Sequence, residues 1–214
     1  MKHGQHGEAV RRRRRRHRRA LRPEALIVYG SFADGTCGPD SDFDAIAVGR
    51  DLPEGHDTDV LGGVRLDLFT WPASAFEGDF DVVDIEQIHG GRPAIDRTGL
   101  AARLLEAVDA HVKRWTPKPP SEVAEELAWC DKMLARARRG DAEGLYRMHW
   151  LLTDSLEICF DALGWRYPGP KKALCRLEQE RPALFAACQS ALAGVEDGAL
   201  EEWIGGIKGV GNRE

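Results

Sequence analysis

Residues 28–44 have the sequence VYGSFADGTCGPDSDFD, and no other segment of the chain is as informative. The apolar run over residues 25–29 predicts a short strand that is buried on both faces. The glycine-rich and proline-containing residues that follow predict a loop, and a second strand is expected over residues 42–48. Because side chains alternate along a strand, Asp42 and Asp44 are expected to point to the same face.

Two carboxylates placed side by side need a cation. Asp42 and Asp44 would repel each other and raise each other's pKa, and a bound cation relieves that repulsion. Oxygen ligands on a rigid strand suit Mg²⁺, which proteins hold with one or two carboxylates plus phosphate and water oxygens. Asp67 stands on a third predicted strand, residues 64–69, on the face opposite its apolar neighbours. The three aspartates predict a catalytic site for two Mg²⁺ ions about 4 Å apart.

The turn after the first strand carries residues that suit phosphate. Gly30 has no Cβ, so the backbone can approach a phosphate closely. The hydroxyl of Ser31 and nearby N–H groups can donate hydrogen bonds to phosphate oxygens. The alternative is an Asp-rich turn in which Asp40 and Asp42 only cap and solvate the loop. A third aspartate on a later strand, Asp67, favours the metal site.

Gly30-Ser31, ten further residues, Asp42-x-Asp44 and the later Asp67 together resemble the signature of the DNA polymerase β-like nucleotidyltransferases. More narrowly, the pattern is similar to the small prokaryotic branch. That branch includes aminoglycoside and lincosamide nucleotidyltransferases and the minimal nucleotidyltransferases of toxin–antitoxin pairs. The resemblance covers residues 26 to about 96.

The resemblance implies an α+β nucleotidyltransferase fold and a reaction of the EC 2.7.7 type. Residues matching Asp42 and Asp44 bind both metal ions and the NTP phosphates, and the one matching Asp67 binds the catalytic metal. The Gly30-Ser31 pair holds the terminal phosphates. The implied co-substrate is an NTP, and the family suggests ATP. Transfer to an acceptor hydroxyl would release pyrophosphate.

Other enzyme classes lack their motifs in this chain. There is no G-x-x-x-x-G-K-[ST] loop, no H-E-x-x-H pair and no G-x-S-x-G elbow. The five cysteines are scattered, without a C-x-x-C pair, which favours reduced thiols over a zinc or disulfide site. No apolar stretch approaches the roughly 20 residues that cross a bilayer, so a cytoplasmic protein without a membrane partner is expected.

Charge is distributed unevenly along the chain. Residues 1–22 carry a net charge of +9, although the whole chain carries −5. The run Arg11–Arg19 could bind RNA non-specifically. The favoured interpretation is a structural helix over about residues 8–22, with arginine stems covering most of its surface. A steep loss of RNA affinity with salt would instead support the RNA interpretation.

A domain boundary is predicted at residues 116–120, TPKPP, because this segment cannot continue a helix. The predicted catalytic domain therefore spans residues 1–116, with weak strands at 81–88 and 93–95. The predicted all-α helical-bundle domain spans residues 117–214. Its expected helices cover about 121–139, 141–163, 171–179, 181–193 and 197–207, with a fraying tail from residue 205. The second helix carries an apolar stripe for the core: Leu145, Met148, Leu152, Leu156, Cys159 and Leu163.

The acceptor is expected to be held between the two domains. The helical domain resembles, in kind only, the bundle that antibiotic nucleotidyltransferases place opposite the metal site. Trp150, Asp154, Glu157 and Asp161 share one helix face by their spacing. They would suit a cationic acceptor such as an aminoglycoside, and one carboxylate could act as general base. The alternative is a solvated acidic face.

Lys171 and Lys172 follow a rigid Pro-Gly-Pro turn. They could reach the NTP triphosphate, or they could begin a surface helix.

Taken together, the sequence predicts Mg²⁺-dependent transfer of a nucleoside monophosphate to a small-molecule hydroxyl, by a monomer or homodimer. The resemblance suggests an aminoglycoside- or lincosamide-like antibiotic as the acceptor. Three alternatives stay open: a protein acceptor, as in AMPylating toxin–antitoxin enzymes, an RNA acceptor, and a nucleotide-binding interaction module without turnover.

Overall fold

The computed structural model describes residues 22–194 and 198–211. The chain divides into two compact units, residues 1–114 and 115–214, which we call the sheet unit and the helical unit. The boundary predicted from the proline-rich segment fell two residues later. The arginine run and most of the predicted basic helix over residues 8–22 lie outside the described residues. No helix in the described ranges is long and apolar enough to cross a membrane.

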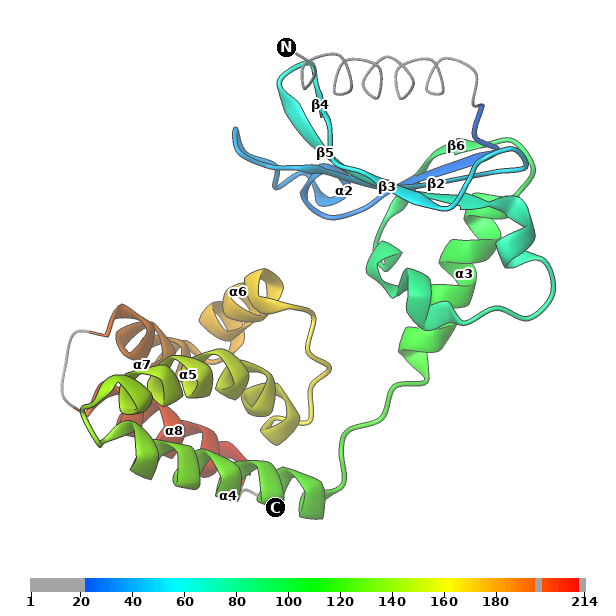
Figure 1. Ribbon diagram of the computed structural model, residues 1–214. Helices are drawn as coiled ribbons and strands as arrows, with labels where there is room; N and C mark the ends of the chain where they lie inside the picture. Colours follow the sequence, from blue (N-terminus) through cyan, green and yellow to red (C-terminus); the bar gives the residue numbers. More distant parts are fainter. Residues whose placement is uncertain (1–21, 195–197, 212–214) are drawn as a thin grey trace, which may run out of the picture. The chain divides into compact units, whose positions relative to one another are not determined.

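The sheet unit combines a mixed sheet with short helices and one long helix (Figure 1). Within the described residues the sheet has six strands in the order β3-β5-β2-β1-β6, and β4 pairs with β5. The strands are β1 (Ala25–Val28), β2 (Phe43–Gly49), β3 (Gly55–Asp57), β4 (Val60–Leu61), β5 (Val64–Pro72) and β6 (Arg92–Asp96). The helices are α2 (Ser31–Asp34), α3 (Leu100–Lys113) and the 3₁₀ helices η1 (Ala73–Phe76) and η2 (Val82–Ile88).

The central strands β1 and β2 form because their sequences are runs of β-branched and other apolar residues. They pair antiparallel, with Ile27 opposite Ile46. One face of the sheet packs on α3 and η2, where Ile85 and Leu104 are fully buried beside these strands. Strand β5 pairs in parallel with β2, along the edge of β2 that faces away from β1. The two central strands are thus held rigidly between β5 and β6.

One predicted strand was wrong. Residues 81–88 form the 3₁₀ helix η2 instead, whereas the weak strand expected at 93–95 is present as β6. The carboxylate of Asp81 accepts a hydrogen bond from the Val83 N–H at 3.0 Å and so begins the helix. Ile85 and Ile88 are both fully buried, and their spacing of three places them on one side of a 3₁₀ helix.

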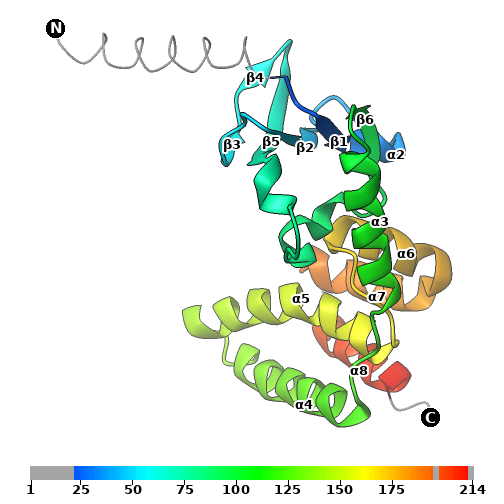
Figure 2. The ribbon, with the colours of Figure 1, turned by 90° about the vertical axis from the view of Figure 1, so that its right-hand side faces the viewer.

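In the helical unit no strand occurs among the described residues, in agreement with the sequence pattern (Figure 2). Its helices are α4 (Pro120–Ala137), α5 (Ala142–Ala162), α6 (Pro170–Glu180), α7 (Pro182–Ala193) and α8 (Ala199–Gly211). Helix α5 begins where the Asp141 carboxylate accepts a hydrogen bond from the Gly144 N–H at 2.8 Å. Helix α4 ends before Gly140, which has a φ of 72°.

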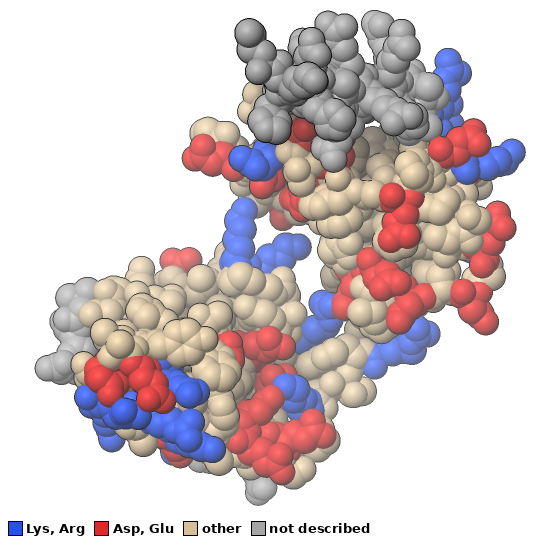
Figure 3. All heavy atoms as spheres, viewed as in Figure 1, with Lys and Arg blue, Asp and Glu red and all other residues tan. Residues whose placement is uncertain are grey.

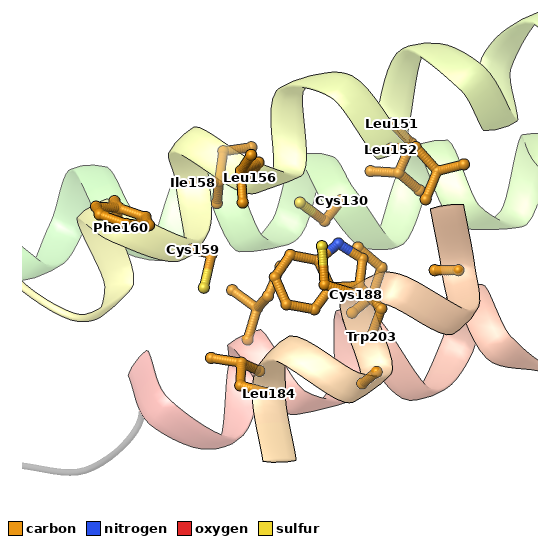
Figure 4. Close-up of a cluster of buried hydrophobic side chains, with 14 of the residues drawn as sticks. Cys130, Leu151, Leu152, Leu156, Ile158, Cys159, Phe160, Leu184, Cys188 and Trp203 are labelled. Atoms are coloured by element: carbon orange, nitrogen blue, oxygen red, sulfur yellow. The ribbon is translucent and has the colours of Figure 1, made fainter. Parts of the chain in front are cut away.

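The core of the helical unit is built around Trp203 of α8 (Figure 4). Its indole Nε1–H donates to Ser155 Oγ at 2.8 Å, and both side chains are fully buried. Three thiols from α4, α5 and α7 lie in the same cluster: Cys130, Cys159 and Cys188. The interior is therefore apolar except for one satisfied hydrogen-bonded pair in the cluster drawn there.

Two details of the helical prediction were wrong. Leu145 was expected in the core stripe of α5, but 52% of it is exposed. It lies in the first turn of the helix, where Gly144 is the buried residue and lies against the end of α4. The tail was expected to fray from residue 205, but α8 continues to Gly211. A Cβ on Gly206 would lie 2.8 Å from Leu184 Cδ1, so the glycine allows α8 to pack closely on α7.

Candidate active site

The site begins where β1 ends, at a glycine pressed against a carboxylate. The Tyr29 N–H donates to the Asp44 backbone oxygen at 3.1 Å, which brings the end of β1 beside the start of β2. Gly30 then adopts φ 64° and ψ −151°, a conformation that is essentially restricted to glycine. A Cβ at this position would lie 2.3 Å from Asp44 Oδ2. The backbone and the carboxylate are thus in close contact, and only glycine fits between them.

Asp44 and Asp67 are direct neighbours in the sheet. Strands β2 and β5 are parallel, with Asp44 opposite Asp67 and Phe43 opposite Leu66. Neighbouring strands lie about 4.8 Å apart, so the two carboxylates start from adjacent positions on one face. Asp42 directly precedes β2, and its Oδ1 lies 3.7 Å from Arg65 Nε. Asp44 and Asp67 therefore occupy adjacent positions in the sheet, and Asp42 directly precedes the strand that carries Asp44.

The charge of this pair affects a buried neighbour. Tyr29 is 8% exposed, and burial raises the pKa of its phenol. The negative charges of Asp67 and Asp44 raise that pKa further. Tyr29 therefore stays protonated at neutral pH and is not a general base.

The loop after Gly30 is tied back to the sheet. Ser31 is the first residue of α2, and the Gly30 carbonyl accepts from the Ala33 N–H at 3.0 Å. The ring of Phe32 meets the ring of Phe43 edge to face at 5.4 Å. Arg92 of β6 donates from Nη2 to the Phe32 carbonyl at 3.4 Å, which brings a cation to the loop predicted to hold phosphate. Sequence analysis had not singled out this arginine.

Sequence analysis also missed a histidine at the site. His56 lies on β3, and its Nε2 is 2.5 Å from Asp67 Oδ1. Its ring stacks on Phe69 with centroids 4.2 Å apart and planes 1° from parallel. Strand β3 is only three residues long and lies within a segment rich in glycine, proline and charge, so periodicity gave no sign of it.

The aspartates fit the oxygen-ligand chemistry of Mg²⁺ by type and by register. Side chains of Asp42 and Asp67 are about half and one-third exposed, so a cation bound by phosphate could reach them. Among the residues that the structure describes, no three His, Cys, Asp or Glu side chains are already gathered as metal ligands. The strands bring Asp44 and Asp67 to neighbouring positions, and substrate phosphates would have to supply the remaining oxygens.

The predicted acceptor residues on α5 are partly engaged with one another. Trp150 donates from Nε1 to Asp154 Oδ2 at 2.6 Å, and its ring meets that of Trp129 at 5.9 Å. Glu157 is exposed. Asp161 is nearly buried and binds Lys118 at 2.8 Å, so it is a structural ion-pair partner and does not belong to an open acidic face.

A hollow of about 340 Å³ lies beside this face, and α4 supplies most of its lining. Its lining residues are Glu122, Glu125, Glu126, Trp129 and Ile158. Acidic side chains gather over the start of α4 on the face shown in Figure 3. Sequence analysis had placed the acidic and aromatic site on α5 alone, because the spacing within one helix does not reveal what a neighbouring helix adds.

Lys118 spans the edge of this acidic region. Its ammonium contacts Glu126 and donates to Asp161. Partial burial opposes the charged form, but the hydrogen bonds and charges of Asp161 and Glu126 outweigh it and raise the pKa of Lys118. One Glu126 oxygen, Oε2, is buried without a hydrogen-bond partner. The region therefore keeps an excess of negative charge.

The two predicted phosphate-binding lysines begin a helix. Lys171 and Lys172 lie in the first turn of α6, and both are exposed. They belong to the helical unit, whereas the aspartates belong to the sheet unit. Their predicted role at the triphosphate stays a prediction.

No protein-family model matches the chain, and no curated protein matches it either. The function is therefore argued from the residues and their geometry.

Proposed function

We propose that this protein is a Mg²⁺-dependent nucleotidyltransferase with a nucleotidyltransferase-type sheet domain. One observation carries the proposal: Asp44 and Asp67 are paired on parallel neighbouring strands, with Gly30 pressed against the Asp44 carboxylate. Paired carboxylates beside a tight glycine turn form a metal site next to a phosphate-binding loop. If these aspartates only capped a turn, the chain would not need a glycine at position 30, where a Cβ would clash with the Asp44 carboxylate.

The residues then have distinct tasks. Asp42, Asp44 and Asp67 would hold the Mg²⁺ ions that accompany the NTP phosphates. Gly30 and Ser31 bind the terminal phosphates through backbone N–H groups and the Ser31 hydroxyl. When bound, Mg²⁺ neutralises charge on the attacking oxygen and on the leaving pyrophosphate.

The reaction is an in-line displacement at the α-phosphorus. The acceptor hydroxyl oxygen forms a new P–O bond, the bond from the α-phosphorus to the bridging oxygen breaks, and pyrophosphate leaves with that electron pair. The acceptor proton passes to a carboxylate acting as general base. Tyr29 does not take this proton, because burial and the neighbouring carboxylates keep its phenol protonated.

For the acceptor, we propose an amine-bearing small molecule, with aminoglycoside-like compounds as the test class. The hollow on the helical unit supports this choice, since it combines three glutamates with the indole of Trp129. Carboxylates attract ammonium groups, and an indole face adds a cation–π contribution of about 0.5–2 kcal/mol. A neutral acceptor would gain nothing from the excess negative charge.

The test measures Mg²⁺-dependent pyrophosphate release from each of the four NTPs, with and without a pooled panel of aminoglycosides and lincosamides. Wild type is compared with Asp44→Ala and with Asp40→Ala, a change on the same loop outside the proposed site. We expect acceptor-dependent release in wild type and Asp40→Ala and none in Asp44→Ala. Equal release from all three proteins would overturn the metal assignment. Release that needs a protein or an RNA instead of the panel would overturn the acceptor class alone.

A further inference from the structure

His56 is placed against Asp67 by the pairing of β3 with β5. The two strands are antiparallel, with His56 directly opposite Phe69 and Gly55 opposite Thr70. Asp67 lies two residues before Phe69, on the same face of β5, and is thus a diagonal neighbour of His56. Long side chains reach such diagonal positions. The contact between His56 Nε2 and Asp67 Oδ1 follows from the strand register.

Two further contacts restrict the imidazole. The ring lies flat on the Phe69 ring, with planes 1° from parallel, so rotation about its side-chain bonds is limited. The strand itself is anchored, because the Thr70 hydroxyl donates to the Pro53 carbonyl at 2.8 Å. The direction of Nε2 is therefore set by packing before any ligand binds.

We propose that His56 is a positioning residue that orients Asp67 for metal binding, an inference that rests on the function proposed above. Its Nε2–H donates to Oδ1 of Asp67 and leaves Oδ2 to face the cation beside Asp44. The donor fixes the carboxylate in one orientation. It also offsets the electrostatic repulsion between the carboxylates of Asp67 and Asp44, which is stronger when no cation is bound.

The expected size of the effect follows from the role. Groups that hydrogen-bond to a metal ligand set its orientation, and their loss typically costs 10–100-fold in metal affinity. His56 is not assigned as a catalytic residue, because its observed contacts are with Asp67 and Phe69 and not with a reacting group.

The test uses two substitutions that separate the donor from the ring. His56→Phe keeps an aromatic ring for stacking on Phe69 but has no N–H. His56→Gln keeps an N–H at a similar reach but has no ring. The probe is Mn²⁺, and the free ion is measured by electron paramagnetic resonance with the full-length protein. Asp44→Ala is the reference for loss of the site.

We expect His56→Phe to weaken Mn²⁺ binding by about 10–100-fold. His56→Gln should weaken it less. Wild-type affinity in His56→Phe would overturn the positioning role and leave the proposed function standing. Equal Mn²⁺ binding by wild type and Asp44→Ala would overturn both, since the bound ion would then not depend on the paired carboxylates on which both proposals rest.

A measurement on the unmodified protein complements the variants. Long-range ¹H–¹⁵N spectra of the imidazole report which ring nitrogen carries a proton. We expect Nε2 of His56 to be protonated in the metal-free protein and its resonances to shift in Asp67→Asn. An unprotonated Nε2 would overturn the proposal, because a donor to Asp67 would be missing.

Discussion

The protein has two acidic regions that are built differently. In the sheet unit, Asp44 and Asp67 sit at paired positions of two parallel strands. In the helical unit, Glu122, Glu125 and Glu126 lie in the first turns of α4 around a hollow. Both regions concentrate negative charge, so composition alone does not distinguish them.

Their backbones and neighbours suit them to different cations. The strand pair fixes two carboxylates at a spacing that is set by the sheet, and the backbone of Gly30 lies directly against the Asp44 carboxylate. A small divalent ion can satisfy both carboxylates at once. The glutamates of α4 surround an indole, and Lys118 already partly neutralises one of them. That arrangement fits a larger organic cation. Fixed strand register and close backbone approach therefore support the proposed metal site better than charge does.

The largest effect should come from removing one charge of the strand pair. Asp67→Asn keeps the size of the side chain but removes the charge of a proposed metal ligand. We expect Mg²⁺-dependent pyrophosphate release to fall by about 10³-fold, since metal-based charge stabilisation contributes several kcal/mol. Glu125→Gln is the matched change in the helical unit, and it should alter KM for the acceptor with kcat nearly unchanged. Similar kcat losses in both variants would contradict the contrast between the regions.

The units should also respond differently to alkaline pH. Burial raises the pKa of Cys130 to about 12 and of Cys188 to about 11, and it raises the pKa of Cys159 as well. The unfolded chain releases these protons from about pH 8.5, whereas the native helical unit retains them. Stability is therefore full below that pH and falls as pH rises, by about 1.4 kcal/mol per pH unit for each thiol.

Thermal melts followed by far-ultraviolet circular dichroism at pH 8, 9 and 10 test this expectation. Cys188→Ala should flatten the decline of Tm with pH, even though the cavity it leaves lowers Tm at every pH. Cys37→Ala is the control in the sheet unit, because Cys37 is exposed. An unchanged slope in Cys188→Ala would show that this thiol does not retain its proton.

A smaller effect is expected from adding a single methyl group beside the strand pair. Gly30→Ala places a Cβ against Asp44 Oδ2 in a conformation that alanine disfavours, at a cost of about 1–3 kcal/mol. Gly35→Ala is a close control, because Gly35 has a φ of 78° but no atom within 4 Å of its Cβ position. We expect pyrophosphate release to fall at least about tenfold in Gly30→Ala, and Gly35→Ala to lose stability only. Equal activity in the two variants would mean that the Gly30 contact is not functional.

Sequence patterns predicted the parts of this site that depend on local alternation. Asp42 and Asp44 were predicted to share a face because side chains alternate along a strand, and Asp67 to lie opposite its apolar neighbours because Val64, Leu66 and Leu68 alternate with Arg65, Asp67 and Phe69. His56 was missed because its position depends on the pairing between β3 and β5. The sequence of a three-residue strand does not indicate such pairing. The hairpin between β4 and β5 did carry a signal, the Gly62-Gly63 turn, and it was overlooked.

In the helical unit, too, local features could be predicted from the sequence and contacts between elements could not. Helix boundaries followed from proline, glycine and the Asp141 cap, which act locally. The hollow beside Trp129 could not be predicted, since it requires knowing which face of α4 lies beside α5. Likewise, the periodicity of α5 did not reveal that Gly144, and not Leu145, is the buried residue of its first turn.

The smallest effect tests the acidic region of the helical unit. Lys118→Met keeps the aliphatic stem but removes the ammonium that contacts Glu126 and Asp161. Lys118 and Glu126 are partly exposed, which weakens that pair, but Asp161 is nearly buried and loses its partner, so the loss of stability should be about 1–3 kcal/mol. The hollow gains one net negative charge, so calorimetry should show an aminoglycoside binding a few-fold more tightly, with the gain shrinking as salt is raised. Lys132→Met, at an exposed position of α4, is the control and should change neither stability nor binding. Weaker binding in Lys118→Met would instead show that Lys118 holds Glu126 in the geometry that the ligand needs.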